Sequence, residues 1–220
     1  MKPIEEKPHF QEGPVTRLLP QRNEPERFSL FVADRFVMTL HREVLATFCI
    51  QEGQLLSVAV QQFLYQAEQE RQAREAALRY LARRARTTQE IVRYLKHAGV
   101  DTTLIQRVIR YLQAQGYVDD EGYAREYVRN RLHYRGYGPR RLRVELQRRG
   151  IPPNVIETAL AEALREISPI AIARQVGQKR WMQLVQSEPD ILKRRRKLLG
   201  YLQRRGFTLE VAYFVLRELS

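Results

Sequence analysis

The spacing of apolar residues changes along the chain, from a short period near the N-terminus to a helical period beyond it. Two β-rich apolar runs, 28–32 and 36–40, flank a short polar connection, and this pattern predicts a β-hairpin. A short apolar piece at 44–48 predicts a brief helix. From 55 to 84 apolar residues recur at helical spacing, although 68–74 are almost wholly charged or Gln. The charged stretch is compatible with one long helix that bridges solvent or with a break between two helices.

The first 26 residues differ from the rest because they carry five of the ten prolines in the chain. They show no repeating apolar period, and frequent proline without a period is typical of tails and linkers. The sequence therefore predicts an irregular, flexible tail over 1–26, with regular structure beginning near residue 27.

A repeat of about 50 residues begins near residue 77 and is aligned by Gly99, Gly150 and Gly206. Apolar residues stand four and eight positions before each glycine, and five, six, nine, ten and thirteen positions after it. The positions before each glycine form one face of a helix that ends there, since glycine is the preferred residue for a left-handed helix end. The positions after it form the wide apolar stripe of a second helix.

Residues typical of helix starts stand at the expected places in these repeats. The run from Thr87 to Glu90 is a capping-box pattern, and Pro139 suits a first helical turn. Asp101, Thr208 and the pair Pro152-Pro153 precede the second helices of the three repeats. The acidic run Asp119-Asp120-Glu121 is interpreted as a linker before a helix, where carboxylates are favourable, rather than as a metal or acid–base site.

The predicted fold is mainly α, because a further helical run precedes each helix pair and gives three helices per repeat. We expect three tandem, helix-turn-helix-like units that form an elongated curved array, with a small N-terminal extension made of the hairpin and a helix. The expected divisions are a tail at 1–26, the extension at 27–70, and repeats at 71–118, 119–167 and 168–220.

Basic residues are concentrated in the repeats. The chain holds 38 Lys and Arg against 25 Asp and Glu, a net charge of +13. Residues 1–70 carry 7 basic and 10 acidic side chains, whereas residues 71–220 carry 31 basic and 15 acidic ones. The resulting net charge of +16 predicts a polyanionic partner for the repeats. Of the basic residues 32 are Arg, whose guanidinium binds phosphate and carboxylate in a bidentate manner.

Several classes of protein are excluded by what the sequence lacks. The single cysteine, Cys49, allows no disulfide framework and no cysteine zinc site, and it suits the reducing cytoplasm. No apolar stretch is long enough to cross a membrane, and the N-terminus has no signal-like apolar region. Four scattered histidines and the absence of glycine-rich or nucleophile motifs leave no candidate catalytic, cofactor or metal site. We therefore expect a non-enzymatic, cytoplasmic protein without a membrane anchor.

Three segments stand in order along the repeats: ALRYLARRARTTQEI at 77–91, GYVDDEGYA at 116–124, and GPRRL continuing through Glu145-Leu146 to Gly150-Ile151. Together they resemble the RecX family of bacterial RecA regulators. Thr87 stands where the family usually has serine, and Tyr123 where it usually has phenylalanine. The resemblance implies a helical modulator that binds RecA and RecA–DNA filaments and restrains recombinase, ATPase and coprotease activity. Its partners would be RecA and the RecA–ssDNA filament, with direct binding of single- or double-stranded DNA also open.

Exposed basic residues are expected in all three repeats, and they are the candidate contacts with a filament or with DNA. The candidates are Arg93, Lys96, Arg125, Arg129, Arg135, Arg140, Arg141, Arg143, Arg194, Arg195 and Arg196. Tyr127 and Tyr134 interleave with arginines on one predicted helix, a pairing that suits nucleic acid or packing between repeats. Trp181 is expected to pack in the core or between repeats.

Two other functions remain open from the residues alone. One is a helix-turn-helix-like protein that binds DNA or RNA directly, without RecA. The other is an α-solenoid adaptor for an acidic protein partner. A direct nucleic-acid binder would hold DNA alone with a steep dependence on salt, whereas an adaptor would not bind DNA. We expect a monomer that needs no cofactor.

Overall fold

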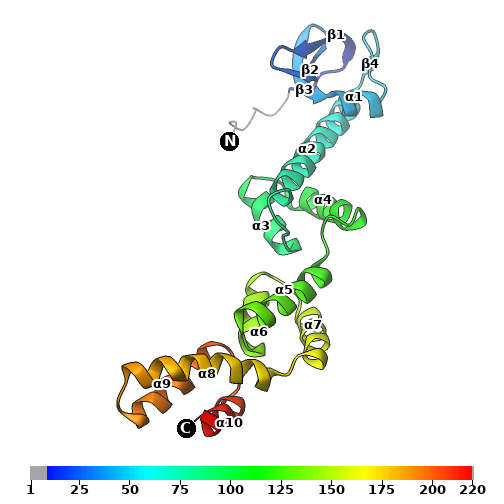
Figure 1. Ribbon diagram of the computed structural model, residues 1–220. Coiled ribbons are helices and arrows are strands. Elements are labelled where there is room, and N and C mark those ends of the chain that lie inside the picture. The colour runs from blue at the N-terminus through cyan, green and yellow to red at the C-terminus, as the bar shows by residue number, and fades with distance from the viewer. Residues whose placement is uncertain (1–8, 220) are drawn as a thin grey trace. The chain divides into compact units, whose positions relative to one another are not determined.

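The computed structural model describes residues 9–219, which divide into two compact units (Figure 1). The first unit takes the described residues up to Arg79 together with Val100–Val108. The second unit takes Tyr80–Gly99 and the described residues from Ile109 onward. The fold is mainly helical, with ten helices and a small four-stranded sheet among the described residues, as the sequence predicts.

The first unit holds an antiparallel sheet in the order β3-β2-β1-β4. Its strands are β1 (Gly13–Gln21), β2 (Glu24–Val32), β3 (Arg35–His41) and β4 (Leu55–Leu56), and helix α1 (Arg42–Thr47) follows β3. The predicted hairpin is confirmed as β2 and β3, joined by two residues of positive φ, Ala33 (46°) and Asp34 (63°). Two left-handed residues match the twist of the flanking strands, so this turn does without glycine.

The predicted tail over 1–26 is wrong for residues 13–26, because β1 and the start of β2 lie there. Residues 1–8 lie outside the described residues. Proline lacks the donor that an interior strand needs, but β1 pairs with β4 only through Gly13 and Pro14 and is otherwise an edge strand. Pro20 therefore pairs with Phe28 beside a register shift without breaking the sheet.

Helix α2 (Val58–Leu81) runs without a break through the charged stretch that leaves two interpretations open in the sequence. The carboxylate of Glu68 lies in the interior of the first unit, with the side chain only 3% exposed. It accepts hydrogen bonds from the His41 backbone N–H at 2.9 Å and from Gln72 Nε2 at 2.9 Å. Arg27 and Arg71 lie at 3.6 and 3.3 Å from it. The charged stretch of α2 therefore does not only face solvent, because Glu68 connects this helix to the sheet.

The remaining helices, together with the C-terminal end of α2, form the repeats, and their glycine ends agree with the sequence prediction. They are α3 (Thr88–His97), α4 (Thr102–Ala114), α5 (Asp120–Arg135), α6 (Pro139–Arg148), α7 (Pro153–Glu166), α8 (Pro169–Ser187), α9 (Ile191–Arg204) and α10 (Leu209–Leu219). Gly99, Gly150 and Gly206 have φ of 79°, 83° and 93°, the left-handed region that favours glycine. Thr87 and Glu90 form the predicted capping box at the start of α3.

The helices α5–α10 share one apolar core in the second unit. The residues predicted four and eight positions before Gly150 and Gly206 are buried there, namely Leu142, Leu146, Leu198 and Leu202. Trp181 is half-buried and packs against this core, as predicted.

Within the second unit the middle helices of successive repeats meet twice at equivalent positions, and we call this contact the repeat joint. At the first joint the Thr87 hydroxyl, at the start of α3, donates to the Arg149 carbonyl at 2.7 Å. At the second joint the Gly138 N–H, at the start of α6, donates to the Arg205 carbonyl at 2.7 Å. Thr87 and Gly138 are equivalent in the repeat, as are Arg149 and Arg205. Each joint thus satisfies a carbonyl that a helix end would otherwise leave unpaired.

Candidate anion-binding cleft

A cleft of about 490 Å³ lies in the second unit at the first repeat joint, and we call it the arginine cleft. Five arginines line it against two glutamates, which gives it an excess of positive charge. Its lining residues are Arg84, Glu90, Arg93, Tyr127, Arg131, Tyr137, Glu145, Arg148 and Arg149. Clustered guanidiniums in a concave surface are typical of sites that bind phosphate or carboxylate groups.

Arg149 is fixed in place because it takes part in the joint itself. One guanidinium nitrogen lies 2.9 Å from Oε1 of Glu90, the capping-box carboxylate. The guanidinium also lies over the ring of Tyr127, 5.1 Å from its centroid. The end of α6 therefore holds an arginine rigidly in the wall of the cleft, with its charge partly neutralised by Glu90.

A second set of contacts fixes side chains of the cleft between α5 and α6. The Tyr127 hydroxyl donates to Glu145 at 2.6 Å, and Arg141 Nε donates to the other oxygen of that carboxylate at 2.8 Å. Burial raises the pKa of Glu145, but these two hydrogen bonds outweigh it and hold the pKa below its usual range. Burial and the bond to Glu145 raise the pKa of Tyr127. Both groups therefore keep fixed protonation states near neutral pH.

Three other guanidiniums in the arginine cleft are available to a ligand. Within the described part of the chain, no carboxylate lies at ion-pair distance from Arg93, Arg131 or Arg148. Arg93 donates only to a carbonyl of its own helix, and Arg131 lies over the Tyr127 ring at 5.1 Å. Because arginines cover this ring, the exposed groups of the cleft are N–H donors rather than aromatic faces.

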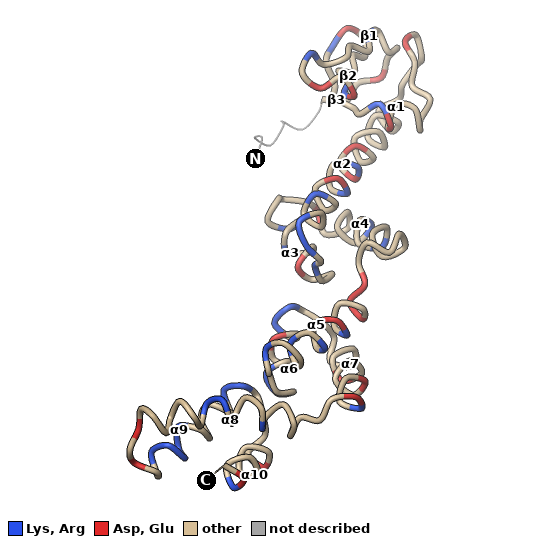
Figure 2. The backbone as a smooth tube through the Cα atoms, in the orientation of Figure 1, with Lys and Arg blue, Asp and Glu red and all other residues tan. Residues whose placement is uncertain are grey.

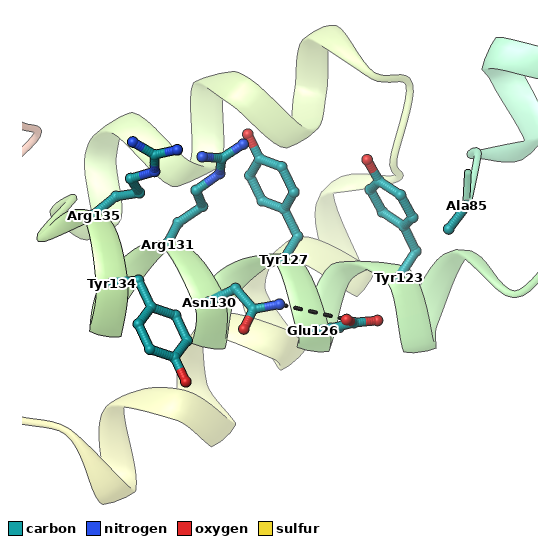
Figure 3. Close-up of a pocket in the computed structure, with 8 residues that line it drawn as sticks. All are labelled: Ala85, Tyr123, Glu126, Tyr127, Asn130, Arg131, Tyr134 and Arg135. Carbon is teal, nitrogen blue, oxygen red and sulfur yellow. Dashed lines mark hydrogen bonds between the residues drawn. The ribbon is translucent and has the colours of Figure 1, made fainter. Parts of the chain in front are cut away.

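A smaller cleft of about 340 Å³ continues along α5 and shares Tyr127 and Arg131 with the arginine cleft (Figure 3). Figure 3 shows Tyr123, Tyr127, Arg131 and Arg135 on one side of α5, with Tyr134 on the other side. Tyr134 is 77% exposed, so its ring is the aromatic surface that remains open here. This combination of an open ring and arginines suits contact with an unstacked base as well as with phosphate.

The eleven candidates from the sequence are spread over the second unit, and Lys and Arg lie on elements of all three repeats (Figure 2). Of these candidates, only Arg93 lines the arginine cleft, and Arg135 lines the smaller one. Within residues 9–219, seven of the eleven have no carboxylate at ion-pair distance: Arg93, Lys96, Arg135, Arg140, Arg194, Arg195 and Arg196. Arg194 and Arg195 are half-buried, and Arg194 lies over the Trp181 ring at 5.8 Å.

The other four candidates are ion-paired, which makes them less available to bind a ligand. Their partners are Glu121 for Arg125 (3.8 Å), Glu166 for Arg129 (4.0 Å), Glu145 for Arg141 (2.8 Å) and Glu157 for Arg143 (2.6 Å). The expectation that Arg141 is freely exposed is wrong. It is half-buried over the Tyr137 ring, and its Cβ packs where Gly206 ends α9.

Sequence reasoning missed four of the five arginines in the arginine cleft. Arg148 and Arg149 have a local explanation as cations in the last turn of a helix, and Arg131 lies at the edge of a buried stripe. Arg84 lies just after α2. The repeat could have pointed to Arg149, because Arg205 stands at the equivalent position, directly before the next repeat glycine. Arg205 takes part in the second repeat joint as Arg149 does in the first.

The acidic run Asp119-Asp120-Glu121 lies at the start of α5 and not in a linker before it, because the helix begins at Asp120. Asp119 caps the helix by accepting from the backbone N–H groups of Glu121 and Gly122 at 3.0 and 2.9 Å. Asp120 accepts from the Thr88 N–H at 2.8 Å and so supports the start of α3. Over residues 9–219 no group of three or more His, Cys, Asp and Glu side chains has an arrangement suited to a metal ion. A search of the same residues finds no helix with the length and apolar character to cross a membrane.

Comparison with known proteins decides the family. Models of the first, second and third three-helix domains of RecX match residues 73–112, 119–160 and 168–216. The chain belongs to the RecX family. It is 31% identical over 212 residues to the regulatory protein RecX of Geobacillus thermodenitrificans strain NG80-2, covering 94% of this chain and 78% of that one. It is 32% identical over 211 residues to that of Geobacillus kaustophilus strain HTA426, covering 94% and 77%.

Solved RecX structures share this fold. One crystal structure of a regulatory protein RecX has a TM-score of 0.75 at 23% identity, covering 93% of this chain and 98% of that one. RecX from Lactobacillus salivarius has a TM-score of 0.60 at 22% identity, covering 70% and 97%. The arginine cleft is therefore lined by residues of the first RecX domain, including Glu90 and Arg93, and by residues of the second, including Tyr127 and Arg149.

Proposed function

We propose that this RecX-family chain regulates RecA by binding RecA–DNA filaments, and that it restrains their recombinase, ATPase and coprotease activities. Membership of a family of regulatory proteins supports a regulatory role. The observation that carries the binding half of the proposal is the arginine cleft, with three guanidiniums that have no carboxylate at ion-pair distance among the described residues. A RecA–DNA filament offers a regular row of anionic groups to such a surface.

In this mechanism the cleft contributes affinity for the filament without recognising the DNA sequence. Arginines held over tyrosine rings lose little side-chain freedom on binding, because the rings already restrict them. Phosphate contacts fix the position of a protein on DNA but carry no base information. The regulator would therefore follow any stretch of filament and act without catalysis, as a monomer in the cytoplasm.

The proposal is tested by titrating the protein into a RecA ATPase assay on single-stranded DNA at substoichiometric amounts. Inhibition well below one protein per RecA is expected, because one bound regulator blocks a stretch of filament. A variant with Arg93→Glu and Arg148→Glu should lose most of this inhibition.

The matched control carries Arg110→Glu and Arg217→Glu, which make the same charge change at exposed positions outside the cleft. It should inhibit nearly as well as the wild type. Equal losses of inhibition from both pairs would mean that the cleft contributes only through the net charge of the protein. No inhibition by the wild type would refute RecA regulation.

The second candidate is a protein that binds nucleic acid directly, without RecA. The open Tyr134 ring, which lines the smaller cleft together with Arg131 and Arg135, favours it, because unstacked bases stack on exposed aromatic rings. Binding to oligo(dT) that matches binding to RecA-coated oligo(dT), with no change in RecA activity, would support this alternative over the first.

A further inference from the structure

The two repeat joints carry different charges, although they occupy equivalent places in the repeat. Two glutamates, Glu90 and Glu145, line the arginine cleft at the first joint. They stand nine and five positions before their repeat glycines. At the second joint the same two positions hold Arg141 and Tyr201. The second joint therefore has neither of these carboxylates at its own equivalent positions.

The arginines, in contrast, are kept at the second joint. Three of the five arginines that line the arginine cleft have an arginine at the equivalent position one repeat later. These pairs are Arg84 and Arg135, Arg148 and Arg204, and Arg149 and Arg205. Within residues 9–219 no carboxylate lies at ion-pair distance from Arg135, Arg204 or Arg205. The second joint is thus more positively charged than the first.

Contacts across the second joint bring these side chains together. The Arg205 side chain, at the end of α9, donates to the carbonyl of Arg135, at the end of α5. Its guanidinium also lies over the Tyr137 ring, 5.8 Å from the centroid. The Arg141 guanidinium lies over the same ring at 3.7 Å. Two guanidiniums therefore share one ring at the place where the first joint pairs Arg149 with a carboxylate.

A further arginine, Arg180 of α8, reaches the same group of side chains. Its guanidinium lies 5.8 Å from the centroid of the Tyr201 ring, and that of Arg205 lies 5.0 Å from it. The Nη1 group of Arg180 donates to Gln183 at 3.1 Å, but its buried Nε has no hydrogen-bond partner in the protein. Arg180 thus adds a third guanidinium, with one donor still unpaired.

Grouping these charges is unfavourable without a counter-charge. Arg141, Arg180 and Arg205 are all half-buried. Of these three, only Arg141 has a described carboxylate at ion-pair distance, Glu145 at 2.8 Å. Like charges repel more strongly at half-buried positions than at exposed ones, because water and salt screen them less. A bound anion would therefore stabilise the second joint, as Glu90 does at the first.

We propose that the second repeat joint is an anion-binding surface in its own right, and that it takes the phosphate groups of a polyanion. A phosphate group presents more acceptor oxygens than a carboxylate, so it can accept from several guanidiniums at once. Guanidiniums lie over both tyrosine rings, so the groups offered to a ligand are N–H donors. The site goes beyond the proposed function, because phosphate binding here does not require RecA.

The test counts phosphate sites on full-length proteins by isothermal titration calorimetry with inorganic tripolyphosphate, which has no base. Three variants carry the same change of charge. They are the joint variant, with Arg135→Glu and Arg204→Glu, the cleft variant, with Arg93→Glu and Arg148→Glu, and the control variant, with Arg110→Glu and Arg217→Glu. All six side chains are exposed, so the variants should melt like the wild type.

The wild type and the control variant should bind two equivalents of tripolyphosphate, one at each joint. The joint variant and the cleft variant should each bind one. The cleft variant then isolates the second joint, and two further probes identify the source of the phosphate. Displacement of tripolyphosphate by oligo(dT) would assign the DNA backbone, whereas binding of tripolyphosphate without displacement would assign a free polyphosphate.

A joint variant that binds as many equivalents as the wild type would overturn this inference. An equal loss in the control variant would also overturn it, because the net charge alone would then explain the binding. A poly-glutamate peptide that binds the cleft variant as tightly as tripolyphosphate does would replace phosphate with an acidic protein segment. None of these outcomes involves RecA, so each leaves the proposed function to its own ATPase test.

Discussion

Among the single residues, Gly150 combines two demands that no other amino acid meets. Its φ is 83°, and a Cβ there would overlap the side chain of Gln89 across the repeat joint. Gly150→Val should lower the free energy of unfolding by about 3 kcal/mol or more, the sum of left-handed strain and overpacking. Gly99→Val is the matched control, because its φ of 79° is similar but no described atom lies within 4 Å of its Cβ. It should cost about 1–2 kcal/mol.

Chemical denaturation of both glycine variants measures the difference. A larger loss at Gly150 shows that the joint contributes to stability, separately from backbone strain. Equal losses at the two positions would mean that the contact with Gln89 relaxes at no cost, and the repeat joint would then have no energetic significance.

Neighbouring arginines in α6 differ in the same way. Arg141 donates to Glu145 one turn along and lies 3.7 Å above the Tyr137 ring, whereas Arg140 is exposed and has no carboxylate at ion-pair distance in the described chain. Arg141→Glu places like charges at i and i+4 and should destabilise by about 1 kcal/mol, a modest figure because water screens part of the effect. Arg140→Glu should leave the melting temperature unchanged. Equal melting of the two variants would contradict this assignment.

The pairing of α5 with α6 makes stability depend on pH through Glu145. Its folded pKa lies below the ordinary value, so its contribution is present above that value and is lost as pH falls through the folded pKa. Tyr127→Phe removes one of the hydrogen bonds that lower this pKa, and it should cost about 1 kcal/mol at pH 7. The difference from the wild type should shrink as Glu145 becomes protonated.

Urea unfolding of both proteins at pH 7 and below pH 4 checks this prediction. A carbon-detected NMR titration of Glu145 should also show its pKa rising toward the ordinary value in Tyr127→Phe. A stability difference that stays constant over this pH range would mean that the Tyr127 hydroxyl acts through packing rather than through the carboxylate.

The elements of the repeats could be predicted from sequence because their signals are local. Capping by Thr87 and the left-handed glycines depend on residues within a few positions, and the apolar stripes report directly which face is buried. Strand β1 was missed because its prolines are acceptable only at a sheet edge, and an edge is a property of the folded sheet. The course of α2 was left open because the partners of Glu68 come from β2 and the end of β3.

For the whole molecule, the basic character of the repeats was predictable from composition but the arginine cleft was not. The cleft depends on the repeat joint, which brings Arg93 of one repeat beside Arg148 of the next. The spacing of residues in the sequence shows on which face of its own helix each residue lies. The repeat joint depends on how the helices of neighbouring repeats pack against each other, which the spacing does not show. Most of the candidates from sequence therefore lie outside the cleft, and several are ion-paired.

This arrangement predicts a binding surface shared among repeats, with its largest single share at the arginine cleft. We would compare paired charge reversals in each repeat: Arg93→Glu with Lys96→Glu, Arg131→Glu with Arg148→Glu, and Arg195→Glu with Arg196→Glu. Each pair should weaken binding to RecA filaments on oligo(dT), and each lost contact should cost about 0.5–1.5 kcal/mol. The first two pairs should couple because Arg93, Arg131 and Arg148 line the same cleft, while the third should add independently because it is distant in the repeat order.

Binding measured over a range of salt concentrations separates this distributed surface from a single reading helix. Each reversed pair should flatten the dependence of affinity on salt, because fewer counterions are released when fewer anionic groups are contacted. A single recognition helix would instead concentrate the loss in one pair and change the preference for DNA sequence. A complete loss of binding from one reversed pair, with no effect of the other two, would contradict the distributed surface and favour a single recognition helix, provided that the variants melt like the wild type.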